Sequence, residues 1–205
     1  MALPLYEMTI SDDMASDLEV TAIALVDEPA IMVNWQAFKT QPGRMNFATV
    51  SDDERLIIGP AMIPDMKIYR NDTEANGLGE YNVFFSKDTV KKIAEKYYAK
   101  GFQGSANIMH DAGQKVDGVN YFLSWIKDDA KGMIGLSGDY PNGTWFVGAR
   151  VNNSDAWAKV KSGAIKGFSV EGMFEYTATQ VVEPDTLAAD ALMQKIKEIL
   201  NGIND

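Results

Sequence analysis

Short runs of β-branched, aromatic and other apolar residues follow one another between residues 55 and 178, and turn-forming residues separate them. Runs of this length, flanked by Gly, Pro, Asn and Asp, are typical of antiparallel strands joined by turns. Their density predicts an α+β domain that is mainly an antiparallel β-barrel, or a sandwich, with a few helices around it. The runs are RLIIGPAMIP, KIYR, EYNVFF, SANIMHD, VNYFLSWIKDD, GMIGLSGDY, TWFVGARV and FSVEGMFEYTAT.

Three helices are predicted around these strands. The clearest spans residues 86–100, with Ser86 as its N-cap and Gly101 as its stop. A short helix capped by Ser154 follows later, and an amphipathic helix is predicted over 186–201. Because an apolar stripe must be buried somewhere, we expect the last helix to mediate self-association or contact with a scaffold protein. Its stripe consists of Leu187, Ala191, Leu192, Ile196, Ile199 and Leu200.

The chain divides into three parts by composition. Residues 1–54 form an N-terminal arm with one strand pattern, LEVTAIALVDEPAIM, before an irregular stretch. Residues 55–178 form the β-barrel domain, and residues 179–205 form a linker and the C-terminal helix. This division predicts that the arm is less integrated into the fold than the region that follows it.

Composition excludes several kinds of function. The net charge of −10 argues against nucleic-acid binding, and the absence of cysteine excludes disulfides, thiolate zinc sites and a cysteine nucleophile. The first residues lack the pattern of a signal peptide, and no apolar stretch is long enough to cross a bilayer. No phosphate-binding loop, dinucleotide fingerprint or EF-hand is present. We therefore expect an intracellular protein without cofactor, metal or membrane contact.

One strand pattern, IKGFSVEGMF, places Ser169 and Glu171 on the same face, about 6.5–7 Å apart. An imidazole that bridges a hydroxyl and a carboxylate spans about the same distance. His110 is the only histidine of the chain and lies where a strand runs into a turn. If it arrives from an adjacent strand, it can act as base to Ser169 with Glu171 as the orienting acid. Asp111 is the alternative acid, and a structural role for both Ser169 and His110 remains the competing interpretation.

Seven blocks of the sequence, in order, resemble the XkdF-like proteins of tailed phages. They cover roughly residues 20–175 and are LVDEPAI, IIGPAMIPDMKIYR, EYNVFFSKDTVKKIA, MHD, SWI, GTWFVGARV and SGAIKGFSVEG. The XkdF-like proteins are regarded as serine proteases of phage heads. The wider group, the prohead proteases, is similar in fold to herpesvirus assemblin.

This resemblance implies an assemblin-like β-barrel and a serine endopeptidase of head maturation. The family's catalytic His and Ser fall on His110 and Ser169, and the third member is Glu171, Asp111 or absent. It also implies cleavage of the phage scaffold, the major capsid protein and the protease itself, in the host cytoplasm inside the assembling prohead. The alternative is a non-enzymatic head component on the same fold, such as a scaffold-core or minor capsid protein.

Overall fold

The structure, a computed structural model, describes residues 3–27, 48–51, 54–71, 79–111, 115–136 and 140–179. The predicted C-terminal helix over 186–201 and most of the irregular stretch before residue 55 lie outside these ranges. The helices of the described part are α1 (Lys87–Ala99), α2 (Ser154–Lys161) and two 3₁₀ turns, η1 (Phe102–Gly104) and η2 (Asp129–Lys131). The strands are β1 (Leu5–Thr9), β2 (Val20–Val26), β3 (Ala48–Ser51), β4 (Leu56–Met62), β5 (Ile68–Asn71), β6 (Glu80–Phe84), β7 (Ala106–Ile108), β8 (Val119–Ile126), β9 (Trp145–Val151), β10 (Gly167–Gly172) and β11 (Glu175–Ala178).

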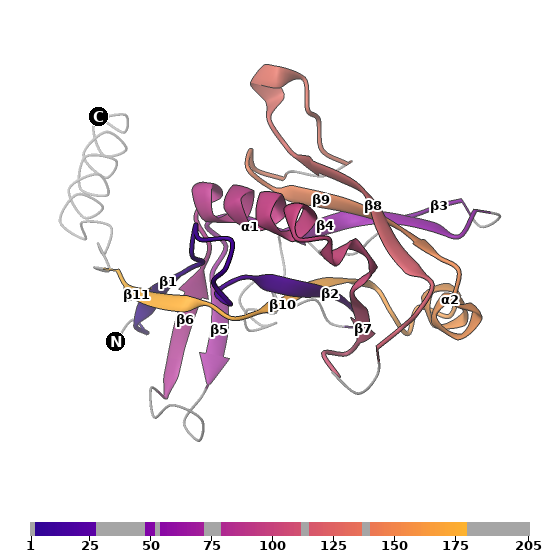
Figure 1. The fold of residues 1–205 in the computed structure, drawn as a ribbon, viewed down its shortest axis with the longest axis horizontal. Coiled ribbons are helices and arrows are strands. Elements are labelled where there is room, and N and C mark those ends of the chain that lie inside the picture. Colours follow the sequence, from indigo (N-terminus) through magenta and orange to yellow (C-terminus); the bar gives the residue numbers. More distant parts are fainter. Residues whose placement is uncertain are drawn as a thin grey trace, which may run out of the picture.

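The strands form three separate sheets (Figure 1). Their orders are β11-β1-β6-β5, β10-β2-β7 and β3-β4-β9-β8, and antiparallel pairs predominate. Two pairs are parallel, β1 with β6 and β2 with β7. The α+β prediction is therefore confirmed. None of the three sheets closes on itself within the described residues, so the β-barrel stays a prediction.

The core lies between the β10-β2-β7 sheet, the β4-β9-β8 part of the third sheet and helix α1. Tyr121 of β8 packs edge-on against Phe168 of β10, with ring centroids 5.7 Å apart. Tyr97 of α1 makes the same kind of contact with Trp145 of β9, also at 5.7 Å. Aromatic pairs of this geometry stabilise a core beyond the area they bury. They hold α1 and β10 against the same sheet, the one that contains β8 and β9.

One buried hydrogen bond ties the third sheet to the second. The Tyr121 hydroxyl donates to the backbone oxygen of Ile23 in β2 at 2.8 Å. Burial raises the pKa of Tyr121 well above its ordinary value, so the hydroxyl stays protonated. The hydrogen bond therefore ties β8 to β2 through a neutral donor.

Both helices begin at side-chain caps. Ser86 accepts a hydrogen bond from Thr89 N, as predicted, and α1 ends before Gly101, which has a left-handed φ of 78°. In α2 the cap is Asn153, whose side chain accepts from Ala156 N at 2.9 Å, and the predicted cap Ser154 is the first helical residue. Among the described residues, no helix combines the length and the apolar character needed to cross a membrane.

Three strands of the predicted N-terminal arm pair with strands of the region from 55 to 178, and β3 does so at the edge of its sheet, beside β4. Strand β2 lies in the middle of its sheet, between β10 and β7, and β1 lies between β11 and β6. Residues Ile23, Ala24 and Leu25 of β2 are fully buried. The expectation of a loosely integrated arm is therefore wrong for β1 and β2, because each lies inside a sheet and β2 also supplies core residues. The boundary at residue 54 itself stays a prediction.

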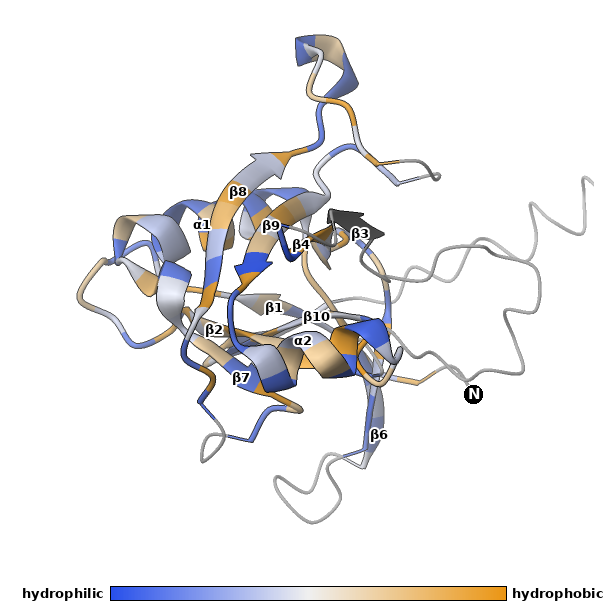
Figure 2. Cartoon of the chain, turned by 90° about the vertical axis from the view of Figure 1, so that its right-hand side faces the viewer, coloured by the Kyte–Doolittle hydropathy of each residue, from blue (hydrophilic) through white to orange (hydrophobic). Residues whose placement is uncertain are grey.

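Two predicted strands differ from the structure. The run GMIGLSGDY forms turns and irregular backbone in its described part, within the connection that projects from the body between β8 and β9 (Figure 2). The run FSVEGMFEYTAT forms two strands, β10 and β11, which belong to different sheets. The break follows Gly172, where the register with β2 shifts. A bulge here turns the chain from one sheet to the next.

Gly172 is required by a close approach of two backbones. A Cβ atom placed on Gly172 would overlap the backbone oxygen of Glu19, which accepts a hydrogen bond from Met173 N at 3.0 Å. We predict that Gly172→Ala lowers the free energy of unfolding by about 1–3 kcal/mol, the usual cost of forcing atoms into a packed site. Urea unfolding measures the effect. Gly104→Ala is the control, because a Cβ there meets no atom within 4 Å; equal losses in the two variants would contradict the prediction.

Candidate active site

His110 lies in a tight turn at the end of β7. Met109 and His110 both have left-handed backbones, with φ of 55° and 58°. Asp111 N donates to Ile108 O at 3.1 Å and closes the turn, as in the hairpin turns whose two central residues have positive φ. Residues other than glycine adopt this conformation at a cost of about 1–2 kcal/mol each, and such strain is concentrated at functional sites. The sequence prediction of a histidine at a strand-to-turn junction is confirmed.

The turn is also anchored to β2. Met109 N donates to Leu25 O at 3.1 Å, and the Met109 sulfur accepts from Asp27 N at 3.4 Å. These contacts continue the parallel pairing of β7 with β2. They fix the direction from which the His110 side chain leaves the backbone.

Ser169 and Glu171 lie on β10, on the other side of β2. Ser169 pairs with Ala24, and Glu171 pairs with Ala22. Directly paired residues share a face of a sheet, so both side chains stand on the face that carries these two alanines. The prediction that His110 comes from a strand adjacent to β10 is wrong, because β2 separates β10 from β7.

Glu171 nevertheless reaches His110. Its Oε2 lies 3.5 Å from His110 Nδ1, and the two side chains are 35% and 41% exposed, so the pair is open to solvent. The same oxygen accepts a hydrogen bond from the side-chain amide of Asn107 at 2.5 Å. One carboxylate oxygen of Glu171 thus lies within 3.5 Å of two side-chain nitrogens from the β7 segment. An imidazole held at Nδ1 presents Nε2 as its free nitrogen.

Ser169 is enclosed. It is 2% exposed, and its Oγ is a buried atom without a hydrogen-bond partner within the part of the chain that the structure describes. The hydrogen bond between Ser169 and His110 that a serine nucleophile requires is therefore not formed in this conformation. A substrate carbonyl reaches Ser169 Oγ only after its surroundings move.

Glu171 is the sequence-predicted acid that the structure brings to His110. Asp111 follows His110 in the turn and is exposed. Asn107 is a member of this site that the sequence did not single out. Its place three residues before His110 is readable in NIMH, but its contact with Glu171 depends on the order of the strands.

The end of β10 beyond Glu171 rests on Glu19, which is 4% exposed. Its carboxylate pairs with Lys100 of the α1 C-terminus at 2.5 Å and with Lys96 at 3.6 Å. Its backbone oxygen accepts a hydrogen bond from Met173 N, directly after the Gly172 bulge. The ion pairs of α1 therefore support the position at which β10 carries Glu171.

Comparison with known proteins adds a family assignment. No curated protein and no solved structure matches the chain. A family model does match, over residues 45–178, and this range contains His110, Ser169, Glu171 and Asn107. The matched range covers more than half of the chain, so the chain belongs to the family described as "Putative phage serine protease XkdF".

Proposed function

We propose that the chain is a serine endopeptidase of phage head maturation, with Ser169 as nucleophile, His110 as general base and Glu171 as orienting acid. The observation that carries the proposal is the position of the only histidine. Its Nδ1 lies 3.5 Å from Glu171 Oε2, and Glu171 shares its strand face with Ser169. Membership of a family of phage serine proteases supports the reaction type.

The proposed reaction is acyl transfer in two steps. His110 Nε2 accepts the Ser169 Oγ proton while Oγ attacks the scissile carbonyl carbon, and Glu171 stabilises the imidazolium through Nδ1. The imidazolium then gives its proton to the leaving amine, and the C–N bond breaks. Water attacks the acyl-enzyme by the same route and releases the serine. The buried position of Ser169 requires the site to open before the first step.

The proposed substrates are the phage scaffold, the major capsid protein and the protease itself. The proposed place of action is the assembling prohead in the host cytoplasm. Both follow from the likeness to the prohead proteases. The apolar stripe predicted for residues 186–201 is the proposed means of self-association or scaffold contact, and it lies outside the described residues.

A non-enzymatic head component on the same fold is the second candidate. The observation that favours it is the Ser169 hydroxyl, which is buried and forms no hydrogen bond to His110. A relic of a protease site keeps its residues but loses this contact. The two candidates differ in whether the chain cleaves any protein.

Co-expression with the scaffold and capsid proteins of the same phage tests the proposal. The wild-type chain should produce defined cleavage products that mass spectrometry locates, and Ser169→Ala should leave all partners at full length. Identical products from both chains would exclude Ser169 as the nucleophile. Intact partners with the wild-type chain, in assembling heads, would favour the non-enzymatic component.

Replacing a carboxylate by a carboxamide tests whether Glu171 or Asp111 is the orienting acid. We expect Glu171→Gln to lower the cleavage rate by up to about 10⁴-fold, less than loss of the nucleophile, because glutamine offers no negative charge to the imidazolium. Asp111→Asn is the matched control and should keep most of the activity. Initial rates on a peptide spanning a mapped cleavage site measure both. Loss of activity in Asp111→Asn with retention in Glu171→Gln would reassign the third residue to Asp111.

A further inference from the structure

Asn107 is a buried polar side chain with an incomplete set of hydrogen bonds. It is 5% exposed, and its Nδ2 donates to Glu171 Oε2 at 2.5 Å. Its Oδ1 is a buried atom with no hydrogen-bond partner among the described residues. Buried polar atoms in folded proteins are nearly always paired, and each exception calls for a reason. An asparagine present only to stabilise the fold would be expected to use both of its polar atoms.

The strand register places Asn107 in the same row as Ser169. Asn107 pairs with Ala24 of β2, and Ala24 pairs with Ser169 of β10. All three side chains therefore stand on one face of the β10-β2-β7 sheet. The outer strands of this sheet lie about 10 Å apart, twice the usual strand spacing. The row ends in two buried polar atoms without partners, Asn107 Oδ1 and Ser169 Oγ.

Alanines on the middle strand allow the outer strands to interact. Glu171 pairs with Ala22 and Asn107 pairs with Ala24, so two methyl groups lie beneath the line that joins the carboxylate to the amide. A longer side chain at either position would stand between them. Glu171 and Asn107 thus meet above β2 and link the strand of Ser169 to the strand that leads to His110.

Without the Asn107 amide, the Glu171 side chain would not be held in place on this face of the sheet. Its side chain is 35% exposed and has three rotatable bonds, so it can turn toward water. Asn107 has a shorter side chain that is buried on all sides, and its amide fixes the carboxylate oxygen that faces His110 Nδ1. A hydrogen bond to a charged acceptor is stronger than one between neutral groups.

We propose that Asn107 is a positioning residue of this site. Its amide holds the Glu171 carboxylate so that Oε2 accepts from His110 Nδ1, which leaves Nε2 as the nitrogen that can accept the Ser169 proton once the site opens. The catalytic part of this inference rests on the proposed serine-protease function. The orientation of the imidazole does not, and it can be measured whether or not the chain cleaves a protein.

The test uses the imidazole of the single histidine, whose nitrogen signals in NMR are assigned without ambiguity. In the wild-type chain, at a pH at which the imidazole is neutral, the proton should reside mainly on Nδ1, because the hydrogen bond at one nitrogen fixes the tautomer. Asn107→Leu keeps the branched shape and the number of heavy atoms of the side chain and removes the amide. It should shift the tautomer toward Nε2–H to the same extent as Glu171→Met does, because methionine has no oxygen that could accept from Nδ1. Asn107→Ser is the second variant if the Asn107→Leu protein does not fold.

Thr144→Val is the matched control, because Thr144 is fully buried and donates a hydrogen bond to Pro141 O at 2.8 Å, outside this site. It should leave the tautomer unchanged. Two results would overturn the inference. One is an Nε2–H tautomer in the wild-type chain, and the other is an Asn107 variant that keeps the Nδ1–H form while Glu171→Met loses it.

Kinetics supply the second readout. On a mapped cleavage peptide, Asn107→Leu should lower kcat by about 10- to 100-fold with little change in KM. Losses of this size are found when residues that orient metal-binding side chains are removed, and Asn107 orients Glu171 in a comparable way. In a Glu171→Met background, which has no acceptor for the Asn107 amide, the same change should have almost no further effect, whereas full multiplication of the two losses would contradict action through Glu171. A chain that cleaves nothing but shows the tautomer shift would refute the protease and keep the positioning role.

Discussion

Ser169→Ala and His110→Ala should each lower the rate of peptide-bond cleavage by about 10⁴- to 10⁶-fold, and the double variant should be little slower than either. The two residues act as a unit, because a serine without its base and a base without its serine fail at the same step. The measurement is the initial rate on a mapped cleavage peptide with purified chains. Independent losses that multiply in the double variant would show that the residues do not form one catalytic unit.

Loss of activity in Ser169→Ala should occur without loss of stability. The Ser169 hydroxyl is buried with no hydrogen-bond partner among the described residues, and such a group costs about 1–3 kcal/mol. Its removal should therefore leave the free energy of unfolding equal to that of the wild-type chain or raise it. A folded, equally stable and inactive variant is the pattern of a catalytic residue. A variant that unfolds instead would assign Ser169 to the core.

Activity should also fall as the pH is lowered through the titration of the imidazole, because a protonated imidazole cannot accept the serine proton. The sole histidine makes this simple to check. The midpoint of the acid limb in kcat/KM should coincide with the His110 titration seen by NMR. A large separation between the two midpoints would assign the limb to another group.

The local geometry of this site was predictable from the sequence because it depends on near neighbours. Alternation along a strand places Ser169 and Glu171 on one face whatever the rest of the fold. The turn at His110 follows a short apolar run, and Ser86 caps α1 through a contact three residues away. Each of these features rests on periodicity or on a cap, which sequence patterns report directly.

The order of the strands was not predictable in the same way. Strand β2 lies between β10 and β7 through pairings that span long stretches of chain, and its pairing with β7 is parallel. Nothing in the sequence VTAIALV indicates between which two strands it lies. Ala22 and Ala24 have short side chains that let Asn107 and Glu171 meet above β2, and this role therefore became visible only in the structure. The same cause explains why Asn107 was missed.

The division of FSVEGMFEYTAT into two strands shows a partial signal. Gly172 lies inside an otherwise regular strand pattern, and an isolated glycine there is a sign of a bulge or of close backbone approach. Both occur, since the register shifts at Gly172 and the Glu19 oxygen leaves no room for a Cβ. The sequence marks the break, but the sheet that receives β11 is set by its pairing with β1.

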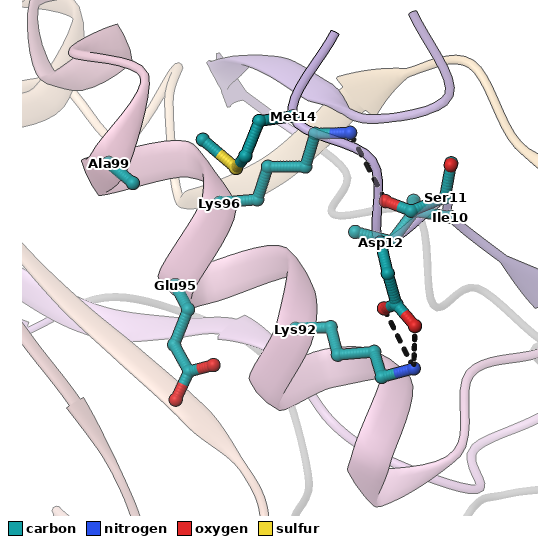
Figure 3. A pocket seen from close by; sticks show the side chains of 8 residues that line it. All are labelled: Ile10, Ser11, Asp12, Met14, Lys92, Glu95, Lys96 and Ala99. Atoms are coloured by element: carbon teal, nitrogen blue, oxygen red, sulfur yellow. Dashed lines mark hydrogen bonds and ion pairs between the residues drawn. The ribbon is translucent and has the colours of Figure 1, made fainter. Parts of the chain in front are cut away.

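Lys96→Met should destabilise the protein by about 3–5 kcal/mol, the usual cost of removing one partner from a buried charged network. The Lys96 side chain is 5% exposed, and its ammonium donates to the backbone oxygen of Ser11 at 3.1 Å (Figure 3). It also donates to the backbone oxygen of Asp13 at 2.7 Å. It also contacts the oxygens of Ser16 and Leu18 at 3.2 and 3.4 Å. Methionine keeps most of the volume but removes the ammonium from all four carbonyl groups, of which those of Asp13 and Leu18 still accept from Ser16 N and Ser11 N.

The same substitution at Lys92 is the matched control. Lys92 lies one turn earlier on α1 and pairs with Asp12 of the same loop at 2.8 Å, but the two side chains are 49% and 73% exposed. Exposed ion pairs contribute at most about 1 kcal/mol, so Lys92→Met should have a small effect in urea unfolding. Equal losses in the two variants would mean that burial of the Lys96 ammonium adds nothing. If the large difference is found, cleavage activity should fall in Lys96→Met before the protein unfolds. The reason is that the loop that Lys96 fastens ends at Glu19, whose backbone supports the strand end that carries Glu171.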